Sequence, residues 1–481
     1  MTWWGKDRGA SSAYRSAGLA LIAGLFLRLY FVHNRAEIAG DSLVYGELAT
    51  NMLSHHIYGL SVDTVRSTLI RLPGYPLLLA AFFAVFGIGN YTAVLYAQVA
   101  LDLGTCLLVA ALARRLMGDN AAMWALWLGA LCPFTANYTA TPLTETWSLF
   151  LLALAFYSME RWWTGTESAR RMRRGWTWPL GCSLAFAVML RPDRLLLAAA
   201  VAPAMLWVAL RTKGSAHERF RRSRLIDVGI VVLIVLLPLC GWTARNWRVF
   251  HVFQPLAPRY ANDPGELVNY GFQHWYRTWA IDFKSTYDVY WSYDGTPLVL
   301  EDLPARAFDS AAQQAETSAL FTRYNGANTA NSQLDSDFAS IARERVAAHP
   351  FRSYLELPVL RVANMWLRPR TEMLPLPLDW WNFRAHPVGS SIAAGLGALN
   401  LAYLVLAAAG LWRWRRQGWS RRRAFGYALV AFVLMRSAML LTMDNSEPRY
   451  TIDCYPIVIL LAAFALAPKR IEMSSMLAGE D

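Results

Sequence analysis

Apolar runs separated by short polar loops repeat along most of the chain. An α-helix needs about 20 mostly apolar residues to cross the hydrocarbon core of a bilayer, and ten runs approach or exceed this length. We predict membrane-spanning helices at residues 14–33, 91–113, 120–138, 146–163, 176–190, 194–211, 225–243, 391–412, 424–442 and 454–467. The pattern therefore predicts an all-α, polytopic membrane protein.

Basic residues are concentrated in three of the loops between these helices. The three clusters are Arg170, Arg171, Arg173 and Arg174; Arg211, Lys213, Arg219, Arg221, Arg222 and Arg224; and Arg413, Arg415, Arg416, Arg421, Arg422 and Arg423. Because cytoplasmic loops of membrane proteins carry an excess of Lys and Arg, we place all three in the cytoplasm. Ten spanning helices with a cytoplasmic N-terminus satisfy this placement and put the C-terminus in the cytoplasm too.

One further apolar run, LPGYPLLLAAFFAVFG (72–87), is predicted not to span the membrane. It is short, and counting it as a spanning helix would invert every later loop and put the basic clusters outside. We therefore expect an interfacial or re-entrant helix on the outer face, with Pro73 and Pro76 at its start.

The predicted topology divides the chain into three regions. Residues 1–243 form an N-terminal transmembrane region whose first outer loop covers 34–90, and residues 391–481 form a C-terminal transmembrane region with a short cytoplasmic tail. Between them, residues 244–390 form a long outer loop or small subdomain, in which residues 334–349 have a helical pattern. A loop of this length usually has a function.

Composition supports the membrane assignment and excludes other classes. The 481 residues are 55% hydrophobic, which is more than a soluble chain of this length usually buries. The net charge of +12 would suggest a nucleic-acid partner for a soluble protein, but here the loop clusters account for it, so no nucleic-acid partner is predicted. The 5 cysteines show neither disulfide nor metal-ligand spacing.

Charged residues of both signs fall on the predicted outer face. They are Asp41, Glu47, Arg66, Arg71, Glu145, Arg191, Arg194, Arg245, Glu447 and Arg449, with the polar Asn246 beside them. This set suits sugar transfer from a phosphate leaving group, because a carboxylate accepts the proton of the acceptor hydroxyl while cations stabilise the departing phosphate. The planar fork of arginine pairs two phosphate oxygens. In a membrane protein, we expect the phosphate to belong to a lipid.

Structural roles remain open for the same acidic residues. Asp41 is placed to cap a helix beginning near Ser42. Glu145 stands in the first turn of a helix that Thr141 would cap and Pro142 would begin, so stabilisation of the helix dipole also accounts for it. Glu47 is readily explained as solvated or paired.

Structural roles also remain open for the arginines. Arg191, Arg245 and Arg449 stand at the ends of predicted helices, where arginine commonly extends its side chain to the interface. Their joint location on the face that is usually poor in basic residues favours a functional role. Arg28 lies within the first predicted helix and is expected to pair internally or to extend to the interface.

Five motifs carry a resemblance to a known superfamily. They are GDSLVYGELA, which contains Asp41, Tyr45 and Glu47; PGYPLLLAAFFAVFG; TPLTETW; RPDR; and EPRYTIDCYP. With them the chain resembles the GT-C glycosyltransferases, in particular the branch of the protein O-mannosyltransferases and the bacterial lipid A aminoarabinose transferases. The resemblance covers residues 14–270 and 390–467.

The resemblance implies roles for individual residues. It implies that Asp41 is the general base or positions the acceptor, that Glu145 is the second carboxylate, and that Arg71 contacts a lipid phosphate. The remaining substrate-binding candidates are Tyr45, Glu47, Arg66, Arg191, Arg245, Asn246, Glu447 and Arg449. Ser42 follows Asp41 where many relatives have a second acid, so no metal or other cofactor is predicted.

The predicted function is a glycosyltransferase of the inner membrane that acts on the periplasmic face. It would move a sugar, with inversion, from a polyprenyl-phosphate donor to a lipid, glycan or protein acceptor. The alternatives are an oligosaccharide ligase of envelope assembly, a transporter or flippase of lipid-linked intermediates, and an inactive scaffold. Transporters typically carry ionisable residues in mid-membrane and have two related halves, whereas the charges here stand mostly at helix ends.

Overall fold

A bundle of long helices forms the main body of the computed structural model, which describes residues 8–164, 170–211, 218–327, 329–417 and 423–468. Each of the ten predicted segments contains a helix. These helices are α1 (Arg8–Arg35), α4 (Tyr91–Met117), α5 (Asp119–Ala130), α7 (Glu145–Thr164), α9 (Thr177–Leu190), α10 (Leu195–Leu210), α11 (Glu218–Phe250), α17 (Pro387–Gln417), α18 (Arg423–Leu440) and α20 (Tyr455–Leu466). Within the described ranges, six of them (α1, α4, α10, α11, α17 and α18) are long and apolar enough to cross a membrane. The all-α, multi-pass architecture is therefore confirmed.

The predicted helix at 120–138 is shorter than expected. α5 ends at Ala130, and the chain continues through a turn into α6 (Pro133–Ala136) and a 3-10 helix η1 (Asn137–Ala140). Pro133 has no N–H to continue the hydrogen bonding of α5, but it suits the first turn of a new helix.

The centre of the bundle is α20, whose side chains are buried almost all round. α20 packs against α17, α5 and α4. Gly410 of α17 lies so close to α20 that a Cβ atom there would be 1.7 Å from the Leu461 carbonyl oxygen. Small residues at such crossings let two helix backbones approach directly within a membrane.

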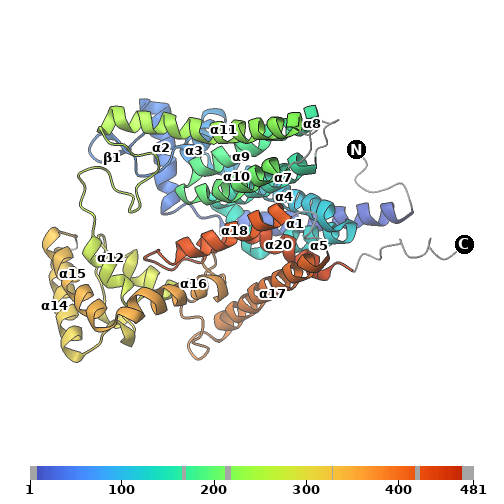
Figure 1. Ribbon diagram of the computed structural model, residues 1–481. Helices are drawn as coiled ribbons and strands as arrows, with labels where there is room; N and C mark the ends of the chain where they lie inside the picture. The colour runs from blue at the N-terminus through green and yellow to red at the C-terminus, as the bar shows by residue number, and fades with distance from the viewer. Residues whose placement is uncertain (1–7, 165–169, 212–217, 328, 418–422, 469–481) are drawn as a thin grey trace, which may run out of the picture.

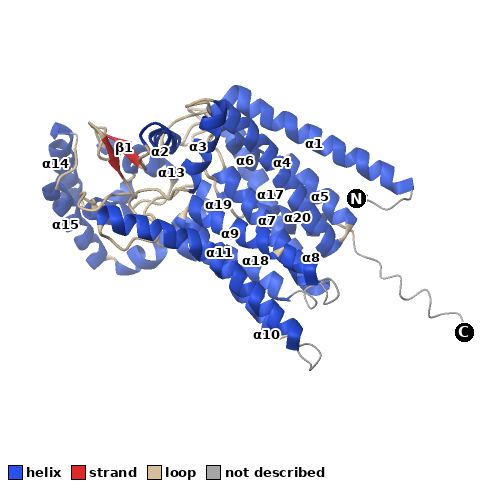
Figure 2. Ribbon diagram, turned by 90° about the horizontal axis from the view of Figure 1, so that it is seen from above, coloured by secondary structure: helices blue, strands red, loops and turns tan. Residues whose placement is uncertain are grey.

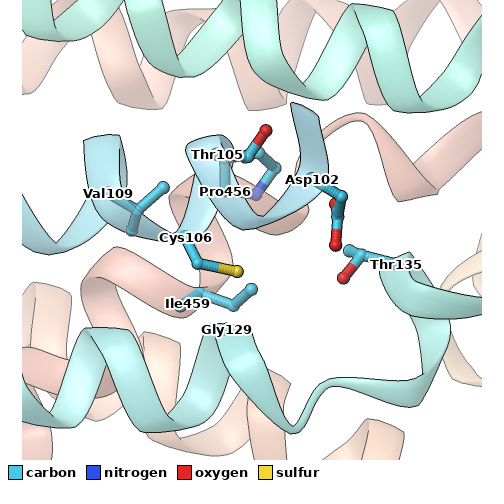
Figure 3. A pocket seen from close by; sticks show the side chains of 8 residues that line it. All are labelled: Asp102, Thr105, Cys106, Val109, Gly129, Thr135, Pro456 and Ile459. Carbon is cyan, nitrogen blue, oxygen red and sulfur yellow. The ribbon is translucent and has the colours of Figure 1, made fainter. Parts of the chain in front are cut away.

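Arg28 of α1 pairs with Asp102 of α4 inside the bundle. Its Nε and Nη2 atoms lie 2.8 and 2.6 Å from Asp102 Oδ2, and the guanidinium also donates to the carbonyls of Gly24 and Gly129, each at 3.0 Å. Figure 3 shows the small cavity beside Asp102, between α4, α5 and α20. Its volume of about 10 Å³ leaves room for at most one water molecule, so it is no substrate site. Of the two roles expected for Arg28, the structure shows internal pairing.

The first loop forms a compact layer on one end of the bundle. It consists of α2 (Asp41–His55), an antiparallel hairpin of β1 (Gly59–Ser61) and β2 (Val65–Ser67), and α3 (Gly74–Phe86). α3 is too short to span, as predicted for this run, and it packs on α2. A Cβ atom at Gly74 would lie 2.5 Å from the Met189 backbone, so α3 also meets the end of α9 closely.

The long loop folds into a helical subdomain at the same end, which we call the long-loop subdomain (residues 251–386). Its elements are α12 (Tyr270–Arg277), α13 (Phe283–Ser285), η4 (Thr286–Tyr290), η5 (Leu300–Asp302), η6 (Ala305–Ala307), α14 (Ala311–Ala327), α15 (Ser332–Ala348), η7 (Arg352–Glu356) and α16 (Leu357–Leu367). A separate aromatic core that includes Trp275, Trp279 and Phe338 joins α12, α14 and α15. The helix predicted at 334–349 is confirmed as α15.

Both loop regions lie at one end of the bundle, which we call the loop end. The basic helix α8 (Arg170–Gly175) lies at the opposite end (Figure 1). Seen from above, α14, α15 and the hairpin again share one end (Figure 2). Two short elements complete the loop end, η2 (Pro192–Arg194) after α9 and α19 (Arg449–Ile452) after α18.

Candidate active site

Asp41, at the loop end, is held between two arginines from distant parts of the chain. Its Oδ1 accepts a hydrogen bond from Arg71 Nη2 at 2.9 Å, and its Oδ2 accepts from both Nη atoms of Arg449 at 3.3 Å. Asp41 is the first residue of α2, but Gly40 occupies the N-cap and the helix has no side-chain cap. The capping interpretation of Asp41 is therefore wrong. Its carboxylate faces cations that the fold has brought to it.

The charges around Asp41 determine its protonation. Burial raises the pKa of Asp41, but the guanidinium groups of Arg449 and Arg71 outweigh burial and lower the pKa from 3.8 to about 2. Burial and the Asp41 charge raise the pKa of Tyr45 to about 12. Asp41 is thus ionised and Tyr45 protonated near neutral pH. A carboxylate of such low pKa is a weak base while both arginines hold it.

Glu145 and Arg191 form a second pair beside the first. Arg191 Nη1 donates to Glu145 Oε1 at 3.2 Å, and the Arg191 guanidinium lies 5.6 Å from the centre of the Tyr450 ring. Arg191 and Arg449 both interact electrostatically with Asp41 and with Glu145. The two predicted carboxylates therefore belong to one charged cluster, with the two arginines between them.

The start of α7 differs from the prediction. The helix begins at Glu145, and Thr141 has an extended backbone in the preceding buried turn, so the predicted cap at Thr141 and start at Pro142 are wrong. The side chain of Glu145 is only 2% exposed, whereas that of Arg191 is 21% exposed. Arg191 therefore presents the accessible part of this pair.

Glu447 orients Arg449. It pairs with the Arg449 guanidinium and accepts hydrogen bonds from Asn445 Nδ2 at 2.7 Å and from the Tyr450 hydroxyl at 2.8 Å. Glu447 is buried, while Asp41, Arg71 and Arg449 keep between a fifth and a third of their side chains exposed. The accessible part of the cluster is thus one carboxylate flanked by arginines.

Three charged residues that the sequence analysis did not select hold this cluster in place. Arg436 of α18 donates to the Tyr450 carbonyl at 2.9 Å and to Asp453 Oδ2 at 3.0 Å, and it also pairs with Asp193. Arg436 thereby connects the loop that carries Arg191 to the turn that carries Arg449. The sequence did contain a signal for Arg436. It lies inside a predicted spanning helix, and an arginine there rarely faces lipid, so an internal partner could have been expected.

Arg194 also belongs to this supporting network. It pairs with Asp453, and its Nε donates to Ser148 Oγ at 3.1 Å. Because its side chain is almost completely buried, Arg194 supports the cluster from the protein interior.

Of two further predicted substrate-binding residues in the first loop, Glu47 stabilises the loop and Arg66 is exposed. Glu47 Oε1 accepts a hydrogen bond from the Ser61 backbone N–H at 2.6 Å and so joins α2 to the hairpin. Arg66 lies exposed in β2, opposite Leu60. Neither contacts the Asp41 cluster within the described part of the chain.

Arg245 and Asn246 hold the end of α11 against the same loop. Arg245 donates to the carbonyls of Thr68 at 2.8 Å and Tyr58 at 3.0 Å, and it donates to Asn246 Oδ1 at 3.0 Å. Asn246 in turn donates to the Gln254 carbonyl at 2.8 Å. These contacts position the hairpin that precedes Arg71.

Comparison with known proteins gives one family match over part of the chain and several matches of fold. Residues 71–242 match the family model described as dolichyl-phosphate-mannose-protein mannosyltransferase. No curated protein matches the chain significantly. An oligosaccharyltransferase from Archaeoglobus fulgidus, solved with a tethered acceptor peptide that contains the NVT sequon, shares the fold with a TM-score of 0.52 and 13% identity. The resemblance to the GT-C superfamily is confirmed. The match covers 97% of this chain and 50% of the archaeal enzyme.

Two further solved structures are similar at lower scores. They are AglB from Archaeoglobus fulgidus with an inhibitory peptide and a dolichol-phosphate (TM-score 0.49, 13% identity, 94% of this chain and 50% of that chain) and ArnT from Cupriavidus metallidurans with undecaprenyl phosphate (TM-score 0.39, 14% identity, 93% and 77%). The chain thus spans about half the length of the archaeal enzymes. At this identity the GT-C likeness is a likeness of fold.

Proposed function

We propose that the protein is a membrane glycosyltransferase that moves a sugar from a polyprenyl-phosphate donor to an acceptor hydroxyl, with inversion. The observation that carries the proposal is the partly exposed Asp41 carboxylate between Arg71 and Arg449. A base and two phosphate-binding cations are the groups that this reaction requires. The match of residues 71–242 to a family named for a dolichyl-phosphate-linked mannose donor supports the donor class.

In this mechanism, the donor phosphate replaces Asp41 as the partner of Arg71 and Arg449. Phosphate suits arginine well because it offers several oxygens to the planar guanidinium fork. Once the arginines pair with phosphate, the pKa of Asp41 rises, and the carboxylate becomes a better base. The donor thereby activates the residue that is to deprotonate the acceptor.

The transfer step then follows in line. Asp41 accepts the proton of the acceptor hydroxyl as its oxygen bonds to the anomeric carbon. The bond from that carbon to the phosphate oxygen breaks, and polyprenyl phosphate leaves with its new charge on the arginines. Attack from the face opposite the phosphate inverts the anomeric centre. Glu145 acts through Arg191, which it holds toward the cluster.

The proposed site is free of metal and faces the periplasm. Arginines contact both oxygens of Asp41, so a divalent cation at this carboxylate would meet two positive charges.

The basic helix α8 lies at the end of the bundle opposite the site, and basic loops normally remain in the cytoplasm. We therefore assign the loop end to the periplasmic side of the inner membrane.

Turnover of defined donors tests the proposal. The full chain in lipid nanodiscs is given a panel of polyprenyl-phosphate sugars, and release of polyprenyl phosphate is measured for the native protein and for Asp41→Asn. Loss of a general base typically slows a reaction by about 10²–10⁴-fold, so we expect at least a hundredfold loss in this variant. The matched control is Asp63→Asn, which removes an exposed carboxylate from the same loop and is expected to keep full activity.

The outcomes separate the competing functions. Consumption of lipid-linked oligosaccharides but not of monosaccharide donors would support an oligosaccharide ligase instead. In proteoliposomes, movement of the intact donor across the membrane without release of polyprenyl phosphate would support a transporter. Native-like turnover by Asp41→Asn would overturn the role of Asp41.

A further inference from the structure

A cavity of about 310 Å³ lies between the long-loop subdomain and the loop end of α18. Arg259 and Arg277 contribute its polar wall, and Leu355 and Val359 of the η7–α16 segment contribute apolar surface. Thr442, just beyond α18, also lines it. The cavity shares no lining residue with the cluster of Asp41, Arg71, Glu145, Arg191 and Arg449.

The polar wall carries a surplus of positive charge. Both arginines pair with a single carboxylate, that of Asp444. Arg259 Nη2 lies 3.2 Å from Asp444 Oδ2, and Arg277 Nε lies 3.3 Å from Asp444 Oδ1. Behind them, the buried Arg361 donates to the carbonyls of Arg277 and Ala280 at 3.0 and 3.1 Å, and its charge repels that of Arg277. Arg259 and Arg277 keep 46% and 31% of their side chains exposed. A second anion is therefore favoured at this wall.

The other side of the cavity continues into an exposed apolar stripe. Phe351, Leu355 and Val359 recur every four residues, and all are about half exposed or more. On the opposite face of the segment, Leu357 and Met365 are buried. α16 packs beside α18 (Figure 1), a helix long and apolar enough to span the membrane. The stripe thus lies on a segment that adjoins a helix expected to contact lipid.

We propose that this cavity binds the phosphate headgroup of a membrane lipid, with the acyl chains along the stripe of Phe351, Leu355 and Val359. Guanidinium groups bind phosphate in bidentate fashion, and the adjoining apolar row suits acyl chains. A soluble anion would pair with the arginines but leave the stripe in contact with water. The lipid would lie against the connection from α18 to α19, which also carries Glu447.

Photolabelling tests this site without reference to sugar transfer. The full chain is placed in phosphatidylcholine nanodiscs that contain a small fraction of photoactivatable phosphatidylglycerol, and labelled peptides are mapped. We expect labels on residues 351–360, and about a tenfold loss or more when both arginines are changed together (Arg259→Gln with Arg277→Gln), because charge-assisted hydrogen bonds are lost. The control is Arg352→Gln, which removes one positive charge from a residue that pairs with Asp309 outside the cavity.

A second variant addresses the apolar half of the proposal. Leu355→Glu places a charge on an exposed position of the stripe, so the fold is expected to survive and labelling to fall. Unchanged labelling in both variants would overturn the proposal. Equal labelling by photoactivatable undecaprenyl phosphate would assign the cavity to the donor, and full displacement by millimolar inorganic phosphate would make it a site for a free anion. Each of these two results would overturn a separate lipid site, whether or not the protein proves to be a glycosyltransferase.

Discussion

Asp41 exchanges partners in the proposed reaction, and its acid–base properties change with the exchange. In the free protein, Arg71 and Arg449 keep the carboxylate ionised down to about pH 2. Because its pKa is depressed in the folded state, this interaction stabilises the fold above the ordinary pKa of 3.8, and the stabilisation is lost as pH falls from there toward 2. When the arginines turn to phosphate, the same carboxylate titrates at higher pH.

The dependence of kcat and kcat/KM on pH in the acid range detects this exchange of partners. The profile of kcat/KM reports the free enzyme, and that of kcat reports the donor complex. For the native protein, we expect protonation of Asp41 to reduce kcat/KM at a lower pH than it reduces kcat. Arg71→Gln removes one of the groups that lower the pKa of Asp41, so its acid limb in kcat/KM moves upward, by about one pH unit or more.

The control for this prediction is Arg66→Gln, which removes an exposed arginine of the same loop and should leave the profile unchanged. Identical acid limbs in the native protein and in Arg71→Gln would contradict the partner exchange.

At the scale of elements, the site depends on how three helix ends are joined. Arg436 projects from α18 and contacts both Asp193, just after α9, and the Tyr450 carbonyl in α19. The accessible arginines at 191 and 449 are therefore positioned by residues that do not themselves belong to the accessible part of the cluster. Damage to these junctions is expected to affect the site and the stability together.

Arg436→Met is predicted to destabilise the protein strongly. It removes one of the two arginines, Arg436 and Arg194, that pair with both Asp193 and Asp453 in a buried setting, and breaking such a network costs about 3–5 kcal/mol. Thermal unfolding in detergent measures the loss. Arg423→Gln, an exposed position at the start of the same helix, is the control and should unfold near the native temperature. A native-like Arg436→Met protein would show that the network has little effect on stability.

Gly74→Ala is predicted to separate α3 from the end of α9. The new Cβ atom would meet the Met189 backbone at 2.5 Å, which side-chain movement cannot relieve. We expect lower thermal stability and at least a tenfold lower kcat/KM, because Arg191 follows this contact directly. Gly241→Ala in α11 has open space around the added methyl group, and alanine favours helix, so it should be neutral or stabilising. Equal behaviour of the two variants would contradict the prediction.

For the molecule as a whole, the two ends of the bundle differ in charge and in content. The loop end carries the Asp41 cluster and the long-loop subdomain, and the opposite end carries α8. This polarity is expected to give the protein one orientation in the membrane, and in the proposed function that orientation decides which compartment supplies the acceptor.

Cysteine labelling tests the orientation. In a variant without the five native cysteines, Asp63→Cys in the hairpin is expected to react with a membrane-impermeant maleimide in spheroplasts. Asp119→Cys, at the start of α5, is exposed at the opposite end and should react only after permeabilisation. The reverse result would place the site in the cytoplasm and exclude the proposed topology.

Prediction from sequence worked best where the signal was local. The ten helices and α3 follow from apolar runs, which any segment displays by itself. Asp41, Glu145 and Arg449 were selected by residue type and position, but their pairings join residues up to 408 positions apart and depend on tertiary packing. The contacts of Glu47 and Arg245 with the backbone in and beside the hairpin also depend on tertiary packing, so the sequence could not indicate them. The end of α5 was misplaced although Pro133 marked it.

The pair of Arg28 and Asp102 also has a consequence for biosynthesis. α1 emerges from the ribosome long before α4, so its arginine enters the membrane ahead of the carboxylate and carbonyls that receive it. An arginine in an isolated helix costs up to about 2.5–3.5 kcal/mol on insertion scales, with the full cost at the helix centre. The first helix is therefore expected to remain beside the insertion machinery until α4 and α5 arrive, and these helices then enter the lipid as a group.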